Sequence, residues 1–303
     1  MNIQQFHYIL AVAEYRHFET AAEKCFVAQS TLSTMISKFE EEIGIKVFDR
    51  RKKPVEITKE GEQILLQLKR IIYEIDYLQE SIQELKGEVK GDIKIGCIPT
   101  IAPFLLPLFL QKFSFKYPDL YIEVKELTTN EIEQRILSRD LDIGIVSTST
   151  LSNDLKIHPL YEEDFVLFDA SNSESKLVEL DSLNMDKFWL LEEGHCMRTQ
   201  VLEICEAAKP QLNPTLNINY KAGSIDSLLR FVKANRGKTL LPVMALIEFT
   251  HKEREQLRYF KNNIPFRTNG LITHPHFAKS KILHAIQEEI IKSISDIKGI
   301  RVL

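Results

Sequence analysis

The chain has 303 residues and a formal charge of −4 at neutral pH, from 39 Lys and Arg against 43 Asp and Glu. At about 150 residues per domain, this length predicts roughly two domains, and 44% hydrophobic with 27% charged residues excludes a disordered, collagen-like or rod-like coiled-coil protein. The slightly negative charge excludes a surface that is basic throughout, as in a nucleic-acid coat, but it allows a local basic patch.

Membrane insertion and a disulfide scaffold are both excluded by the sequence. No apolar run approaches the roughly 18 residues that predict a membrane span, and the first residues lack the basic and apolar regions of a signal peptide. The four cysteines, Cys25, Cys97, Cys196 and Cys205, are too few for a disulfide scaffold of this size. We therefore expect a cytoplasmic protein with no membrane contact, in which any disulfide is regulatory.

The N-terminal residues are predicted to form short helices followed by a small hairpin. Apolar residues at helical spacing predict helices over 6–13, 18–25 and 30–43, and Gly44 is placed to end the last one. Two short apolar runs then flank the basic segment 49–54, which predicts a β-wing with a basic tip.

Residues 59–89 contain no proline and predict one long helix. Its apolar residues recur in alternating steps of four and three, which is the heptad pattern of a dimerising helix. This seam consists of Ile64, Leu68, Ile71, Ile75, Leu78, Ile82 and Leu85. Gly87 and Gly91 then mark a hinge before the next domain.

The remaining residues alternate predicted strands with predicted helices. Asp92–Ile98, Leu120–Glu126 and Leu141–Val146 have the composition of buried strands, and two further strand–helix units follow within 188–241. This alternation predicts a parallel sheet and an α/β fold. Such sheets bind ligands at the carboxyl ends of their strands, where Thr100 lies just after the first strand.

The two N-terminal helices and the turn between them predict a helix-turn-helix. The second helix of this motif meets base edges with its N-terminal residues, and hydroxyl and basic side chains contact both bases and phosphates. The candidate DNA-binding residues are Ser30, Thr31, Ser33, Thr34, Lys38, Arg50 and Arg51. On the helix pattern alone, the alternative is a solvated basic loop on a small helical cap.

The N-terminal pattern resembles the DNA-binding signature of LysR-type transcriptional regulators, and the resemblance spans nearly the whole chain. The matching residues are 18–33, 36–39, 41–44, 47–50 and 57–61. The resemblance implies a winged helix-turn-helix at 1–58, a dimerising linker helix at 59–90 and a two-lobed α/β effector domain at 91–303, similar to periplasmic binding proteins. It also implies promoter double-stranded DNA, RNA polymerase and further copies of the chain, from homodimer to homotetramer, as partners.

A second candidate site lies around Cys196, which opens a predicted helix after Gly194. A helix N-terminus lowers the pKa of a thiol, and the neighbouring side chains of His195 and Arg198 could add to this effect. The combination predicts a reactive cysteine. The alternative, from residue types alone, is a buried and unreactive thiol.

The run Glu193–Arg198, with a second cysteine nine residues after the first, resembles the peroxide-sensing OxyR subfamily of LysR-type regulators. The resemblance implies that hydrogen peroxide oxidises Cys196 to a sulfenic acid and that Cys205 resolves it as a disulfide. The positions that it assigns to peroxide binding or to tuning of the thiol are Thr100, Thr129, His195 and Arg198. We expect no cofactor and no metal site, because no Cys or His cluster has zinc spacing.

Two positions depart from the OxyR pattern. His274 stands near the end of the strand 271–275, where the subfamily carries an arginine, and Asn219 stands before the turn at Ala222, where the subfamily often has a histidine. These departures predict a thiol whose sensitivity to peroxide differs from that of the subfamily.

The spacing of Cys196 and Cys205 predicts a conformational switch. In one continuous helix, residues nine apart have Cα atoms about 13 Å from each other and point to opposite faces, whereas a disulfide needs about 4.4–6.8 Å. Oxidation must therefore unwind the segment 196–205, and the disulfide then holds a refolded segment. The refolding would change how the effector domains pack.

Two other functions fit parts of the sequence. The first is a LysR-type regulator that binds a small metabolite between the effector lobes, with Cys196 incidental. The second is a thiol peroxidase, which the helix-turn-helix disfavours because an enzyme of this class has no use for one.

Overall fold

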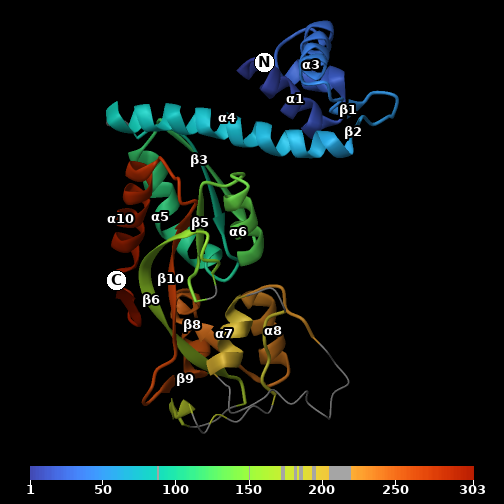
Figure 1. Ribbon diagram of the computed structural model, residues 1–303. Helices are drawn as coiled ribbons and strands as arrows, with labels where there is room; N and C mark the ends of the chain where they lie inside the picture. Colours follow the sequence, from blue (N-terminus) through green and yellow to red (C-terminus); the bar gives the residue numbers. More distant parts are fainter. Residues whose placement is uncertain are drawn as a thin grey trace. The chain divides into compact units, whose positions relative to one another are not determined.

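The computed structural model describes the 303-residue chain except for 87–88, 150, 172–174, 181–182, 184–186, 193–195 and 205–219. The chain divides into two compact units, Met1–Lys86 and Gly87–Leu303 (Figure 1). Each unit has a hydrophobic core of its own. No helix in the described part of the chain combines the length and apolarity needed to cross a bilayer.

The first unit is a helical bundle with a two-stranded wing. Asn2 and Gln5 form a capping box at the start of its first helix. As predicted, Gly44 ends the third helix, with φ of +70°. Leu32, Ile36 and Phe39 pack the third helix into the core. The elements are α1 (Ile3–Tyr15), α2 (Phe18–Lys24), α3 (Gln29–Ile43), β1 (Phe48–Asp49), β2 (Glu56–Ile57) and α4 (Lys59–Lys86).

The predicted seam of α4 is buried near the start of the helix and exposed near its end. Leu68 is only 4% exposed and packs in the core of the first unit, together with Leu65. Further along the helix, Leu78 and Leu85 are 60% and 88% exposed. The first part of the seam therefore anchors α4 to the helix-turn-helix, and the second part exposes Leu78 and Leu85.

The second unit is built on a mixed sheet, not on the parallel sheet that the alternation predicted. Strand β3 (Gly91–Cys97) is parallel to β4 (Leu120–Glu126) and to β5 (Ile143–Ser147). Strand β10 (Phe266–Thr273) is antiparallel to both β5 and β6 (Lys156–Asp169). The difference arises because the chain leaves the first core along β6 and returns to it along β10, so that these two long strands run in opposite directions.

Two cores lie along these crossing strands. The first contains the start of β6 with the helices α5 (Ala102–Lys116), α6 (Thr129–Leu137) and α10 (Ser280–Ile294), of which α5 and α10 are packed against each other. The second surrounds the end of β6, which pairs with β8 (Lys238–Pro242) and β9 (Leu257–Phe260). The other elements are β7 (Leu177–Val178), α7 (Cys196–Ile204), α8 (Ile225–Ala234), the 3-10 helix η2 (Val243–Leu246), α9 (His251–Glu255) and β11 (Ile300–Val302).

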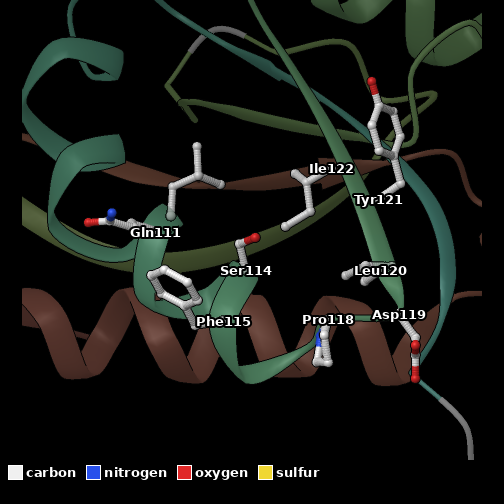
Figure 2. Close-up of a pocket in the computed structure, with 9 residues that line it drawn as sticks. Gln111, Ser114, Phe115, Pro118, Asp119, Leu120, Tyr121 and Ile122 are labelled. Atoms are coloured by element: carbon white, nitrogen blue, oxygen red, sulfur yellow. The ribbon is translucent and has the colours of Figure 1, made fainter.

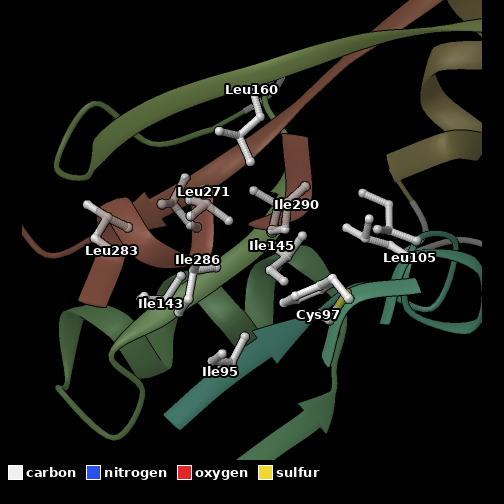
Figure 3. Packing of buried hydrophobic residues seen from close by; sticks show 14 of the residues in the cluster. Ile95, Cys97, Leu105, Ile143, Ile145, Leu160, Leu271, Leu283, Ile286 and Ile290 are labelled. Carbon is white, nitrogen blue, oxygen red and sulfur yellow. The ribbon is translucent and has the colours of Figure 1, made fainter. Parts of the chain in front are cut away.

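Cys97 is part of the first core, as predicted. Figure 3 shows its sulfur at the end of β3, among side chains that include Leu105 and Ile145. The thiol is fully buried, and burial raises the pKa of Cys97 far above its ordinary value. It is therefore a structural thiol that stays protonated at neutral pH.

Candidate functional site

The recognition helix α3 turns its polar face away from the core. Ser30, Thr31, Thr34 and Lys38 are exposed, and Ser33 is half-buried. The apolar residues Leu32 and Ile36 alternate with them at helical spacing and are completely buried. The predicted hydroxyl-rich surface is thus the solvent-facing side of α3.

Arg50 connects the wing to this recognition helix. Its Nη1 donates to Ser33 Oγ at 3.0 Å, its Nη2 lies 3.4 Å from Glu40 Oε2, and its guanidinium lies 4.8 Å from the centre of the Phe18 ring. Glu40 is only 1% exposed and also accepts hydrogen bonds from the backbone N–H groups of Val47 and Phe48, at 2.8 and 3.2 Å. Arg50 therefore positions the wing and Ser33 within the first unit.

Arg51 is arranged differently from Arg50. Its side chain is 90% exposed and pairs with Asp49 at 3.0 Å within the wing. Hydrogen bonds from Arg51 lower the pKa of Asp49 to about 2. The wing tip therefore presents its basic side chains to solvent, where a phosphate backbone can approach them.

The helix α7 begins at Cys196, as predicted. Cys196 is half-buried and packs against the first core, whereas Met197 and Val201 of the same helix are buried in the second core. The first turn of α7 therefore contacts both cores of the second unit. This places the thiol where α7 meets both cores of the second unit.

A buried arginine in β10 interacts electrostatically with this thiol. Arg267 Nε lies 2.8 Å from Glu163 Oε2, and Nη1 and Nη2 donate to the hydroxyl and carbonyl oxygens of Thr100 at 3.0 and 3.1 Å. Burial by itself would lower the pKa of this guanidinium, but the charges of Glu163, Tyr161 and Cys196 raise it above its usual value. Arg267 is therefore a permanent cation buried within the second unit.

Arg267 was missed by the sequence analysis, which looked for an arginine at the other end of the same strand. His274 follows the last residue of β10, whereas Arg267 is the second residue of that strand. The departure at His274 therefore stands, and Arg267 supplies an arginine at the beginning of the same strand. The available signal was a lone arginine in an otherwise uncharged strand, because a buried cation requires a partner.

Glu163 fixes the position of this arginine. It is fully buried, and its Oε2 accepts from Asn269 Nδ2 at 3.0 Å in addition to Arg267. Its Oε1 accepts from the backbone N–H of Met244 at 2.9 Å. Because the carboxylate is held by two donors from β10 and one from η2, the guanidinium has one defined orientation.

Hydroxyl groups gather at the carboxyl edge of the parallel strands. Thr100, Thr129 and Ser147 lie at or just after the ends of β3, β4 and β5. The side-chain oxygens Thr129 Oγ1 and Asn269 Oδ1 are buried without a hydrogen-bond partner among the described residues. A small ligand that donates hydrogen bonds could satisfy such oxygens.

The other predicted residues of the thiol centre have different positions. Arg198 Nη1 donates to the backbone oxygen of Leu191 at 3.0 Å, so its guanidinium anchors α7 to the preceding segment. His195, Cys205 and Asn219 lie outside the described residues. Within the described ranges, no group of three His, Cys, Asp or Glu side chains could hold a metal ion.

The second unit also has a hollow of about 790 Å³ between α5 and β4. Figure 2 shows that Gln111, Ser114 and Phe115 line it from α5, and that Leu120, Tyr121 and Ile122 line it from the beginning of β4. Thr129 follows the opposite end of that strand. The hollow is therefore separate from the thiol centre.

Comparison with known proteins finds family models that match both units of the chain. The family model for the LysR substrate binding domain matches residues 86–293, and the model for the bacterial regulatory helix-turn-helix protein, lysR family, matches residues 3–62. A hydrogen peroxide-inducible genes activator from Haemophilus influenzae is 31% identical over 305 residues, which cover 98% of this chain and 99% of that protein.

The chain belongs to the LysR family of transcriptional regulators, in its OxyR subfamily. The DNA-binding transcriptional dual regulator OxyR of Escherichia coli K12 is 31% identical over 91% of this chain and 90% of its own length. The solved structure of a full-length OxyR variant from Pseudomonas aeruginosa aligns with a TM-score of 0.73 at 28% identity, over 96% of this chain and 95% of that one. The winged helix-turn-helix is therefore the DNA-binding module of a transcriptional regulator.

Proposed function

We propose that this LysR-type regulator senses hydrogen peroxide, that it controls oxidative-stress genes, and that it switches through a reversible disulfide between Cys196 and Cys205. The observation that carries the proposal is the buried guanidinium of Arg267, which is held by Thr100 and Glu163 and whose charge interacts with Cys196. The printed names of its relatives, hydrogen peroxide-inducible genes activators, support the same signal.

The proposed reaction has two steps. The Cys196 thiolate attacks one oxygen of hydrogen peroxide, the O–O bond breaks, and the leaving hydroxide takes up a proton to become water. The Cys205 thiolate then attacks the sulfenic sulfur, so that the S–S bond forms, the S–O bond breaks and a second hydroxide leaves as water. The two thiols lose two electrons in total, and one peroxide molecule gives two molecules of water.

Residues around the thiol have separate roles in this proposal. Arg267 positions Thr100 through two hydrogen bonds and supplies a permanent positive charge. Because Arg267 already donates to Thr100 Oγ1, the hydroxyl hydrogen of Thr100 is free to donate to a peroxide oxygen. The Oγ1 of Thr129 is buried without a partner among the described residues and can accept from the peroxide. His195 is assigned to the same pocket from its place before Cys196.

The exposed surfaces of the first unit indicate the proposed partners. Promoter double-stranded DNA contacts the exposed face of α3 and the wing tip, and RNA polymerase is recruited at the promoter. The exposed apolar residues of α4, among them Ile71, Leu78 and Leu85, support a homodimer that pairs further into a homotetramer. Because each of these partners is intracellular, we place the protein in the cytoplasm.

Peptide mass spectrometry of peroxide-treated protein tests the reaction. We expect stoichiometric peroxide to join Cys196 to Cys205. Replacement Cys196→Ser should abolish the reaction, whereas Cys205→Ser should accumulate a trappable sulfenic acid on Cys196. First oxidation at Cys25 or Cys97 would contradict the proposal. If all thiols remain reduced after peroxide treatment, the result would favour the alternative function, a regulator that binds a small metabolite between the effector lobes.

A further inference from the structure

The side chain of Gln200 joins α7 to the central sheet. Its Nε2 donates to Ser147 Oγ at 2.6 Å and to Ser149 Oγ at 2.7 Å, and Ser147 Oγ in turn lies 3.1 Å from the backbone oxygen of Thr268 in β10. Gln200 is 5% exposed and Ser147 is completely buried. We call the contact of Gln200 with these two serines the Gln200 bridge.

The Gln200 bridge lies on the same face of α7 as the thiol. Residues four apart are neighbours on a helix surface, and Cys196 and Gln200 both point toward the first core, whereas Met197 and Val201 point into the second. The bridge therefore ties the redox-active end of α7 to the strand next to Arg267. It exists only while α7 is helical in this position.

An intact α7 excludes a disulfide from Cys196 to Cys205 wherever Cys205 lies. The helix runs from Cys196 to Ile204, so their Cα atoms are about 12 Å apart. The next Cα atom lies about 3.8 Å from that of Ile204. Cys205 is consequently at least about 8 Å from Cys196, beyond the limit of about 6.8 Å for a disulfide. The bond requires α7 to unwind.

We propose that the Gln200 bridge is a regulatory contact that holds the reduced conformation and thereby sets the thiol–disulfide equilibrium of this sensor. The inference rests on the proposed disulfide. Unwinding of α7 breaks both hydrogen bonds, so the bridge stabilises the dithiol form and not the disulfide form. Gln200 acts through α7 and does not touch the reacting atoms, which makes it a positioning residue.

Redox titration of the full chain in glutathione buffers tests this role. We expect Gln200→Ala to raise the equilibrium constant for disulfide formation about tenfold, because it removes two hydrogen bonds from the reduced state. Ser149→Ala, which removes one exposed acceptor, should raise it about threefold. In a Cys205→Ser background, the rate at which peroxide oxidises Cys196 should stay within about twofold of the unmodified rate when Gln200 is replaced.

Thr199→Ala is the matched control. Thr199 is an exposed neighbour in α7, and both alanine replacements increase helix propensity, which favours the reduced helix and opposes the expected shift. A rise in the constant with Gln200→Ala but not with Thr199→Ala therefore isolates the bridge. Circular dichroism of each reduced variant checks that the fold is retained.

The outcomes separate this inference from the proposed function. If the unmodified chain forms the disulfide and Gln200→Ala leaves the constant unchanged, the Gln200 bridge has no regulatory role and the sensor proposal stands. If Gln200→Ala slows oxidation of Cys196 more than tenfold, Gln200 belongs to the peroxide site and its positioning role is wrong. If the unmodified chain forms no such disulfide, both proposals fall.

Discussion

The two candidate sites of this regulator are built in opposite ways. The DNA-binding face comes from one short helix and an adjacent wing, and most of its side chains are exposed. The thiol centre collects side chains from several elements that are distant in sequence, and Arg267 and Glu163 within it are each at most 2% exposed. Replacements should therefore affect binding alone at the first site, but both stability and reactivity at the second.

The largest effect is expected for Arg267→Met. It leaves the Glu163 carboxylate buried without its cation, so the free energy of unfolding should fall by about 3–5 kcal/mol. The peroxide reaction of Cys196 should slow as well. The double variant with Glu163→Gln removes the unpaired charge and should regain much of the stability without the reactivity. Denaturant unfolding and thiol oxidation kinetics measure the two effects, and normal kinetics in the double variant would rule out a direct action of the guanidinium.

Charges in the exposed seam of α4 should change the assembly and leave the thiol centre intact. Ile71→Asp with Leu78→Asp would place like charges opposite each other in a dimer seam, so light scattering of the full chain should return the monomer mass. Leu66→Asp is the control, because Leu66 is 53% exposed but lies off the seam. An unchanged mass in the double variant would show that the seam is not the dimer contact.

Replacements of Arg50 and of Lys38 should weaken DNA binding for different reasons. Arg50 holds Ser33 in place, so Arg50→Gln should lower the affinity for DNA about tenfold. Because Glu40 already neutralises the charge of Arg50, the salt dependence of binding should change little. Lys38→Gln should reduce the salt slope by about one. Mobility shifts at several salt concentrations, on a duplex selected by the unmodified chain from a random pool, measure both. A slope reduced by one with Arg50→Gln would instead indicate a phosphate contact.

The smallest effect on sensing is expected for Cys97→Ala. The Cys97 thiol is fully buried and its pKa is raised by burial, so it is not a thiolate at neutral pH and does not compete for peroxide. The rate of Cys196 oxidation should remain within about twofold, although removal of the sulfur from a packed core lowers stability. A sulfenic acid detected on Cys97 of the unmodified chain would contradict this account.

The contrast also explains which features the sequence could predict. The helix-turn-helix, the Gly44 cap and the start of α7 at Cys196 depend on contiguous residues, whose spacing is visible in the sequence. The roles of Arg267 and Gln200 depend on pairing between β10, β5 and α7, and no local pattern records that pairing. The antiparallel direction of β10 was missed for the same reason, since periodicity identifies a strand but not its neighbours.

Strand β6 has a thermodynamic consequence for the second unit. Its residues 156–164 pair with β10 beside the first core, and 165–169 pair with β8 in the second. Because one uninterrupted strand belongs to both cores, melting of either core removes hydrogen bonds from the other. Calorimetry should therefore record a single cooperative transition for residues 87–303, and a protease should not release either core as a stable fragment.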